Sequence, residues 1–270
     1  QYTLYVKDLQ TNEVLDTKIK NTTGSTAWSS NNINFFYVKK NEQTLRPEKV
    51  FLHDISKPTD LDTLIYFEED ETFSVYVNES KSKEYIFLAS YSTLTTEYQF
   101  TKSSEPFSDF KLIQKRTRGL EYSVSHFKDK FYIMNNKDGA HNYKISATSI
   151  ENPSSENWID ILVHRDNVLL EDFEIFNDHW VVTERENGLT RIKVKRWDET
   201  EDYFIPVSGK TYSISGSLNP NFETSNFRFS YTSLSTPTTI FEYDMNSKTK
   251  KILKQRTVPN SKFKSDNYIE

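Results

Sequence analysis

The sequence predicts an all-β protein made of repeated four-stranded sheets. Two observations lead to this prediction: an apolar, aromatic-rich strand recurs about every 46–50 residues, and further short strands accompany each copy in the same order. The recurring strand is anchored by one aromatic residue per repeat, namely Phe35, Tyr85, Phe131, Trp180 and Phe227. A four-stranded antiparallel sheet with this period is typical of a β-propeller blade.

The other strands of each repeat are recognised by their Tyr, Phe, Val and Ile content and by alternating polarity. A first, shorter strand precedes each anchor and reads TAWS, SVYV, YSVS, FEIF and SISG in the successive repeats. A third strand is centred on Phe51, Tyr98, Tyr143, Ile192 and Phe241. A fourth strand is expected over residues 64–67, 110–114, 158–162, 203–207 and 251–255.

Polar turns separate these strands. The chain has six glycines, so the turns must use Asn, Asp, Ser and Lys, as in residues 31–34, 128–130 and 246–249. Two similar Ser/Thr runs, 92–96 and 235–239, are predicted to be loops between second and third strands. Pro237 supports this prediction because proline fits only in such a loop or at a sheet edge.

Counting the strands gives about five and a half blades. Five units are expected at about 22–70, 71–117, 118–165, 166–210 and 211–256, and together they form a β-propeller fragment over residues 1–256. Residues 1–21 read as a partial blade, with a third strand over 2–9 and a fourth over 14–19. Residues 257–270 lose the periodicity and are predicted to be a linker, so we expect a piece of a larger protein.

Composition limits the classes of partner. A net charge of −5 and the lack of a basic stripe argue against nucleic acid, and no apolar run reaches the ~18–20 residues of a membrane span. The absence of cysteine excludes disulfides and thiolate metal sites. No signal peptide is visible, and we expect a cytoplasmic protein, with the periplasm as the alternative.

No catalytic motif is found in the sequence. The pairs Gly24-Ser25 and Gly216-Ser217 lack the second glycine of a G-x-S-x-G nucleophile elbow, and a phosphate-loop match over 207–211 fails because its first glycine position is Phe204. The five histidines occur singly, without metal-ligand spacing, and are predicted to lie at the surface or at strand ends. We therefore predict no catalytic residue, no cofactor and no metal.

Two loop segments are candidates for contacts with another domain or for gating substrate access. Arg46 lies in a long loop between a second and a third strand. The acidic run Glu68, Glu69, Asp70 and Glu71 follows a fourth strand. Paired carboxylates could exchange protons or attract cationic ligands, and the alternative is a solvated connector between blades.

Several stretches resemble one known family. They are residues 27–38, 44–55, 64–77, 95–100, 121–139, 169–194 and 231–245, and the most specific blocks are TLRP, GLTRIKV and STPTTIFEYDM. They resemble the propeller of the oligopeptidase B (protease II) branch of the prolyl oligopeptidase family of serine peptidases. The resemblance covers nearly the whole chain, in order and with similar spacing.

The resemblance implies a function for the parent protein. Members join a seven-bladed propeller to a C-terminal α/β-hydrolase domain that carries a Ser-Asp-His triad, and this branch cleaves short peptides after Arg or Lys. The propeller covers the active site and excludes folded proteins. The triad has no matching positions here, so this chain is expected to be inactive alone and to provide size selection and interdomain contacts.

Two other classes of propeller protein are alternatives to a peptidase. A binding-only propeller, serving as a scaffold for proteins or peptides, predicts no hydrolase sequence elsewhere in the parent protein. A propeller glycosidase needs Asp or Glu on the inner strands of several blades, and in those strands only Glu174 is acidic. The glycosidase is therefore disfavoured, and the scaffold stays open as the alternative.

Overall fold

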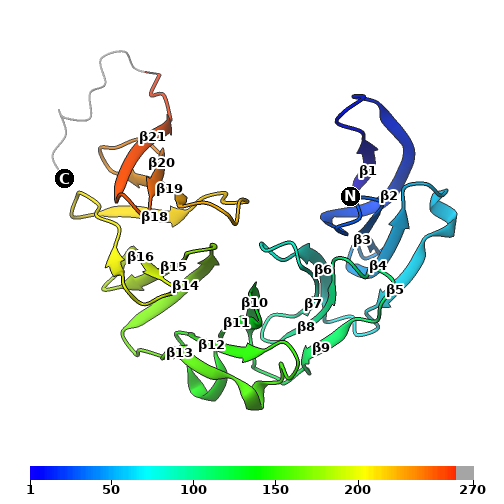
Figure 1. Ribbon diagram of the computed structural model, residues 1–270, viewed down its shortest axis with the longest axis horizontal. Coiled ribbons are helices and arrows are strands. Elements are labelled where there is room, and N and C mark those ends of the chain that lie inside the picture. The colour runs from blue at the N-terminus through cyan, green and yellow to red at the C-terminus, as the bar shows by residue number, and fades with distance from the viewer. Residues whose placement is uncertain (260–270) are drawn as a thin grey trace. The chain divides into compact units, whose positions relative to one another are not determined.

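The computed structural model describes residues 1–259 and has an all-β fold (Figure 1). The described residues contain 21 strands in five antiparallel sheets, and within each sheet the strands follow one another in chain order. This confirms the predicted fold class, a β-propeller built from successive meanders. The helical segments of the described residues are short 3₁₀ turns at Thr59–Leu61, Lys137–Gly139 and Ser155–Asn157, and none of them could cross a membrane.

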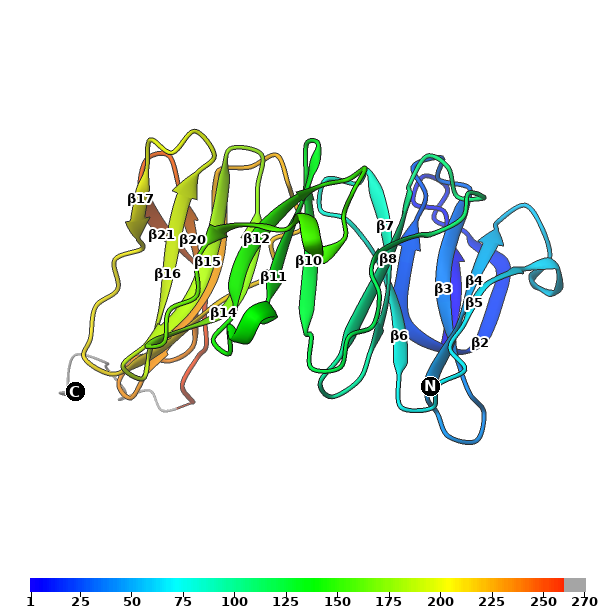
Figure 2. The same cartoon turned by 90° about the horizontal axis from the view of Figure 1, so that it is seen from below.

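The chain forms two compact units, of which the first comprises residues 1–137 and 146–159. Its first sheet contains β1 (Tyr2–Lys7), β2 (Val14–Trp28), β3 (Asn34–Lys40), β4 (Pro47–Asp54) and β5 (Thr63–Phe67). Its second sheet contains β6 (Ser74–Glu79), β7 (Tyr85–Tyr91), β8 (Thr96–Lys102) and β9 (Lys111–Gln114). Figure 2 shows β2 to β5 lying side by side in the first sheet.

The second unit comprises residues 138–145 and the residues from 160 onward. A third sheet contributes to both units and contains β10 (Tyr122–Phe127), β11 (Lys130–Asn135), β12 (Lys144–Ser149) and β13 (Ile159–Leu162). The fourth sheet contains β14 (Val168–Ile175), β15 (His179–Glu186), β16 (Leu189–Arg196) and β17 (Asp202–Phe204). The fifth contains β18 (Tyr212–Gly216), β19 (Asn226–Ser233), β20 (Thr239–Asp244) and β21 (Thr249–Gln255).

The recurring aromatic strand is the second strand of the repeated four-strand pattern, represented by β3, β7, β11, β15 and β19. In β3, β7, β11 and β15 it reads as a nearly continuous apolar run, because the strand lies inside its sheet and both of its faces can be covered. In β19 the exposed Arg228 interrupts the run. In β7, Tyr85 and Phe87 pack toward the third sheet, whereas Ile86 and Leu88 pack toward the first. Burial of one such side chain stabilises the fold by roughly 1.5–3 kcal/mol, so these strands account for much of the packing between sheets.

The core consists of clusters between neighbouring sheets. In the first unit, one cluster joins the first and second sheets through Phe36, Val50 and Ile86, and another joins the second and third through Phe100 and Phe131. In the second unit, a cluster of buried side chains joins the fourth and fifth sheets. Its members are Phe176, Val181, Ile192, Val194, Ile205, Ile214, Phe227, Phe229, Tyr243 and Met245. Each sheet is thus held by its neighbour in the same unit.

The predicted turns and loops also agree with the structure. Asn32, Lys128 and Lys248 have φ values of 56°, 56° and 58° in the three predicted turns, which is the left-handed conformation that such turns require. The two Ser/Thr runs separate β7 from β8 and β19 from β20, and Pro237 lies in the second of these loops.

The structure differs from the predictions at the beginning of the chain. The sequence predicts a separate partial blade over 1–21, but the segments 14–19 and 26–28 belong to one long strand, β2. Thr22 pairs with Tyr2 of β1 and with Lys39 of β3, so β1 joins the first sheet and makes it five-stranded. Asn21 has a φ of 59° and the register shifts between Thr22 and Thr26, which indicates that the strand bends by a bulge instead of ending in a turn.

Two further strand predictions were inaccurate. Tyr143, the predicted centre of a third strand, has a φ of 61° and lies just before β12. The fourth strand expected over 203–207 is reduced to β17, although the Ile205 N–H still donates to the Ile192 carbonyl of β16 at 2.9 Å. The predicted linker over 257–270 lies, from residue 260 onward, outside the described residues.

The meander places two kinds of segment at the same end of each sheet. In an antiparallel four-stranded meander, the loop between the second and third strands and the connector that leaves the fourth strand emerge at one end. We call this the connector end of the sheet. The segments singled out in the sequence, around Arg46 and Glu68, both lie at the connector end of the first sheet.

Candidate functional site

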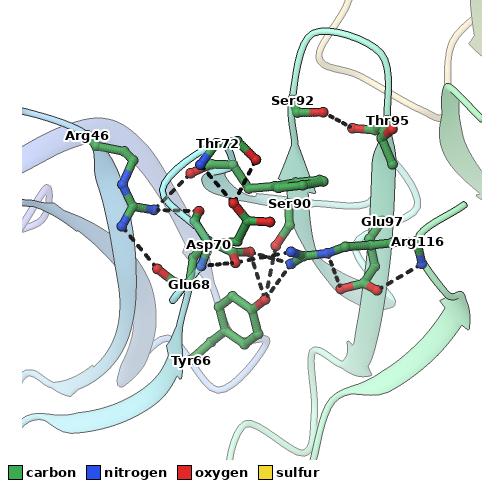
Figure 3. Close-up of polar contacts among 11 residues, drawn as sticks. Arg46, Tyr66, Glu68, Asp70, Thr72, Ser90, Ser92, Thr95, Glu97 and Arg116 are labelled. Carbon is green, nitrogen blue, oxygen red and sulfur yellow. Dashed lines mark hydrogen bonds and ion pairs between the residues drawn. The ribbon is translucent and has the colours of Figure 1, made fainter. Parts of the chain in front are cut away.

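A polar network occupies the connector end of the first two sheets (Figure 3). Arg46 immediately precedes β4, Glu68 immediately follows β5, and Arg116 follows β9 of the second sheet. The two arginines bind different parts of the segment 68–73, which leads from β5 to β6. We call this segment the β5–β6 connector.

Arg46 binds the backbone of the β5–β6 connector. Its guanidinium donates hydrogen bonds to the carbonyl oxygens of Glu68 (3.1 Å), Asp70 (3.3 Å) and Phe73 (2.8 Å) and to the carboxylate of Glu48 (3.1 Å). The Arg46 side chain is only 14% exposed. Because three acceptors are main-chain carbonyls, the planar guanidinium fixes the path of the connector.

The loop before β4 directs Arg46 to this position. The Asn41 side-chain oxygen accepts hydrogen bonds from the N–H groups of Gln43 (2.9 Å) and Thr44 (3.0 Å). Leu45 follows with a φ of 63°, and the Asn41 N–H closes the loop on the Arg46 carbonyl at 2.8 Å. Local Asn chemistry of this kind is typical of turns, and here it turns Arg46 back over the connector.

Glu68 is the buried centre of the network. Its side chain is 3% exposed and is bound by two nitrogens of Arg116, one of them 3.1 Å from Oε1. The Tyr66 hydroxyl (2.9 Å) and the Asp70 N–H (3.1 Å) donate to the same carboxylate. The Arg116 guanidinium also lies over the Phe73 ring, 4.0 Å from its centroid. Glu68 and Arg116 thus connect the first sheet to the second.

The protonation state of Glu68 follows from these contacts. Burial raises the pKa of the Glu68 carboxyl, but the hydrogen bonds from Arg116, Tyr66 and the connector backbone outweigh burial, and the pKa lies below its ordinary value. A general acid or base works best with a pKa near the working pH. Glu68 therefore suits a permanent ion pair and not proton transfer.

The remaining acidic residues behave differently. The Asp70 carboxylate accepts hydrogen bonds from the Thr72 hydroxyl (2.7 Å) and N–H (2.9 Å), and these bonds lower the Asp70 pKa. Glu69 and Glu71 are exposed, and neither has a hydrogen bond or ion pair within residues 1–259. The five predicted residues thus divide into two network members, one turn-forming residue and two free carboxylates, and their contact with another domain stays a prediction.

Two members of the network were missed from the sequence. Glu97, at the start of β8, accepts the backbone N–H of Arg116 at 3.2 Å and lies 3.4 Å from its Nε. Arg116 follows the fourth strand of its sheet just as Glu68 follows the fourth strand of the previous sheet. Equivalent positions in consecutive repeats are thus the signal that could have revealed this pair.

A second cluster in the first unit has the connectivity of a catalytic triad but is closed to solvent. Thr17 Oγ1 lies 3.4 Å from His53 Nε2, and His53 Nδ1 lies 2.6 Å from Asp62 Oδ1. The Tyr37 hydroxyl donates to the other oxygen of Asp62 at 2.7 Å. Thr17 is 6% exposed and His53 is 0% exposed, so a substrate cannot reach the hydroxyl. The cluster satisfies buried polar groups.

Together, the repeated four-stranded sheets and the ion pairs that join them define a β-propeller domain. A family model described as the N-terminal β-propeller domain of prolyl oligopeptidase matches residues 1–256, and the chain belongs to this family.

The relatives found by sequence are peptidases by name. Dipeptidyl aminopeptidase BI of Pseudoxanthomonas mexicana is 35% identical over 259 residues, which cover 96% of this chain and 36% of that protein. Protease 2 of Moraxella lacunata is 29% identical over 255 residues, which cover 94% of this chain and 36% of that protein. The chain therefore spans little more than a third of the length of these relatives.

Solved structures agree with this assignment. Oligopeptidase B from Leishmania major has the same fold, with a TM-score of 0.91 at 24% identity, over 98% of this chain and 38% of that chain. Oligopeptidase B from Trypanosoma brucei, in a closed form with covalently bound antipain, gives a TM-score of 0.88 at 27% identity, over 94% of this chain and 37% of that chain.

Proposed function

We propose that this chain is the lid domain of a serine oligopeptidase that cleaves short peptides after Arg or Lys. The observation that carries the proposal is the family match, which extends over residues 1–256. The likeness to a relative named Protease 2 and to oligopeptidase B structures supports the specificity for basic residues. The partner is a C-terminal α/β-hydrolase domain of the same polypeptide, and this domain supplies the Ser-Asp-His triad.

In this proposal the propeller limits which peptides reach the active site and docks against the hydrolase domain. It admits short peptides and excludes folded proteins, and its connector ends contact the hydrolase domain or the incoming peptide. The exposed carboxylates of Glu69 and Glu71 are suited to attract basic peptides, because like charges on one face raise the local concentration of a cationic ligand. Arg46 and Glu68 contribute indirectly, by holding the connector that carries these carboxylates.

Peptide hydrolysis by the complete polypeptide tests the specificity. We expect cleavage of short peptides after Arg or Lys, loss of cleavage after treatment with a fluorophosphonate that labels the active serine, and resistance of folded proteins that display the same sequence. Peptides with Ala at the cleavage position are the control and should be cleaved far more slowly. Absence of hydrolysis together with retained peptide binding would favour the alternative, a non-catalytic scaffold.

A second candidate activity is release of dipeptides from a free amino terminus. It is favoured by the relative named dipeptidyl aminopeptidase, which is 35% identical to this chain. Acetylation of the peptide amino terminus separates the two activities. An acetylated peptide should still be cleaved after Arg or Lys by an endopeptidase, whereas blocking the amino terminus abolishes dipeptide release.

Charge-neutralising variants test the predicted contact residues in the complete polypeptide. Glu69→Gln with Glu71→Gln should raise KM for basic peptides several-fold at low salt and have little effect at high salt, because exposed charges are screened. A matched control is Glu84→Gln with Glu151→Gln, two exposed glutamates at the opposite ends of their sheets. Equal effects in both pairs would contradict a role specific to the connector.

Arg46→Met tests the arginine in the same assay. We expect altered size selection, seen as faster cleavage of longer peptides, because the connector loses its backbone clamp. Unchanged activity and unchanged size selection would remove Arg46 from the proposal.

For the cellular compartment, the cytoplasm stays our prediction and the periplasm is the alternative. Fractionation of the source cells tests this prediction.

A further inference from the structure

Two histidines and an aspartate converge at the connector end of the third sheet, within the second unit. His141 lies in the loop between β11 and β12, and His164 and Asp166 lie in the segment 163–167 between β13 and β14. One potential ligand atom of each residue lies within 4.8 Å of the other two, and the imidazole centroids are 4.7 Å apart. We propose that these residues bind a divalent transition-metal ion, with Zn²⁺ as the best-suited ion.

The backbone around the cluster is fixed. The Asn142 side-chain amide donates hydrogen bonds to the carbonyls of Arg165 (3.1 Å) and Asp166 (2.8 Å), and the Asn142 carbonyl accepts the Leu170 N–H at 3.0 Å. The loop that carries His141 is thereby fastened to the segment that carries His164. A metal site needs ligands whose backbones are already in place, and these bonds provide that condition.

The side chains have free lone pairs and room to move. His141 Nδ1 lies 3.3 Å from the Gly139 carbonyl, which favours the proton on Nδ1 and leaves Nε2 for a metal, the usual arrangement of a metal-bound histidine. His164 Nε2 is buried and has no hydrogen-bond partner within the described residues, and Nδ1 lies 3.7 Å from Asp166 Oδ1. The Asp166 side chain is 91% exposed and can rotate toward the imidazoles.

The adjustment that binding requires is small. Zn–N bonds of about 2.0–2.1 Å bring two ligand atoms to about 3.4 Å from each other in tetrahedral geometry, so the cluster must contract by ~1.4 Å at most. His141 and Asp166 are exposed, so theirs are the side chains that would rotate to close this distance. Arg165, which lies between two of the ligands in sequence, does not compete for Asp166, because its guanidinium is 2.5 Å from Glu184.

The ligand types select the metal. Imidazole nitrogens favour Zn²⁺, Cu²⁺, Ni²⁺ and Fe²⁺ over Mg²⁺ and Ca²⁺, which prefer oxygen. The other three histidines, His53, His126 and His179, are 0% exposed, whereas His141 is exposed and the His164 side chain is 21% exposed. The sequence predicts no metal because 23 residues separate the two histidines, and only the pairing of their loops brings them together.

Calorimetric titration with ZnCl₂ of the complete, untagged and chelator-treated polypeptide tests the site. We expect His141→Ala and His164→Ala each to lower Zn²⁺ affinity at this site at least tenfold, and Asp166→Asn to lower it less. Asp138→Asn is the matched control, since Asp138 lies in the same loop, is exposed and is absent from the cluster, and its affinity should equal that of the parent protein.

Two further measurements separate the site from metal bound elsewhere and from misfolding. Co²⁺ should give visible absorption bands that decrease in the His141→Ala, His164→Ala double variant, while the far-ultraviolet circular dichroism of that variant without metal matches the parent. Unchanged Zn²⁺ stoichiometry and affinity in the double variant would overturn the proposal. An equal loss of affinity in Asp138→Asn would also overturn it, because the effect would then reflect charge and not coordination.

Discussion

Two connectors of this chain are each held by a side chain from a preceding loop and by an ion pair to the next sheet. The connector contributes the acidic partner of the ion pair, Glu68, in the first unit and the basic partner, Arg165, in the second. In the first unit, Arg46 from the loop between second and third strands clamps the β5–β6 connector, and Glu68 of that connector pairs with Arg116 near the next sheet. In the second unit, Asn142 from the corresponding loop clamps the segment 163–167. Its Arg165 pairs with Glu184 of β15 in the next sheet.

The two ion pairs differ in how many arginines bind the buried carboxylate. Glu68 is 3% exposed and depends on one arginine, whereas Glu184, at 0% exposed, is bound by both Arg165 (2.5 Å) and Arg191 (3.0 Å). A buried carboxylate left without a cation is strongly destabilising, but one that keeps a second arginine is not. The link from a connector to the next sheet thus depends on one arginine at Glu68, whereas at Glu184 a second arginine remains when the first is removed.

The largest expected effect comes from Arg116→Ala. It leaves the Glu68 carboxylate buried with only neutral donors, and we expect it to lower the free energy of unfolding by about 3 kcal/mol. Arg165→Ala should cost about 1 kcal/mol, since Glu184 keeps Arg191. Urea denaturation of the two variants measures the difference, and equal losses would show that redundancy is not what separates the two connectors.

Removing the side chain that clamps each connector should also destabilise the first unit more than the second. Arg46→Ala removes bonds to three carbonyls and one carboxylate, and we expect a loss of about 2 kcal/mol, whereas Asn142→Ala should cost about 1 kcal/mol. Arg46→Lys should recover only part of the loss, because an ammonium group cannot reproduce the planar fork. Unfolding in urea gives the energies, and hydrogen exchange at residues 68–73 shows whether the connector has loosened.

Acid should weaken the first connector. The folded-state pKa of Glu68 lies below its ordinary value of 4.5, so its stabilising contribution is complete above the unfolded pKa and is lost as pH falls through the folded pKa. Arg116→Ala should therefore differ most from the parent protein at neutral pH and least near pH 3. Unfolding free energies from pH 7 to pH 3 measure this convergence, and a constant difference would contradict it.

The smallest effect is expected at the exposed carboxylates. Glu69→Gln and Glu71→Gln should each change the free energy of unfolding by less than about 0.5 kcal/mol, because neither side chain has a partner within the described part of the chain. Thermal unfolding is sufficient to check this. A larger change would mean that the connector uses these charges for folding, and their proposed role in docking would lose its support.

The strands could be predicted because their signal is local. The second strands β3, β7, β11 and β15 each carry a continuous apolar run, such as residues 85–89, and the run recurs with the repeat. The bend in β2 and the position of Tyr143 could not be predicted, because a bulge at Asn21 and a left-handed residue before β12 depend on how neighbouring strands pair. The sequence analysis singled out Arg46 and the acidic run and thereby located the β5–β6 connector, but it did not predict which residues they contact.

The sequence by itself determined the repeat, the all-β class, the turns, the position of Arg46 in a loop between two strands and the position of Glu68 after a strand, since all of these follow from periodicity and residue type. Only the tertiary structure decided the partners. Glu68 and Arg116 are separated by 48 residues, about one repeat. They meet because the first two sheets pack against each other and each residue follows the fourth strand of its sheet. His141 and His164 meet because the loop between β11 and β12 and the segment after β13 lie at the same end of the third sheet. Contacts between repeats depend on packing, and the local sequence does not specify which side chains of neighbouring repeats will meet.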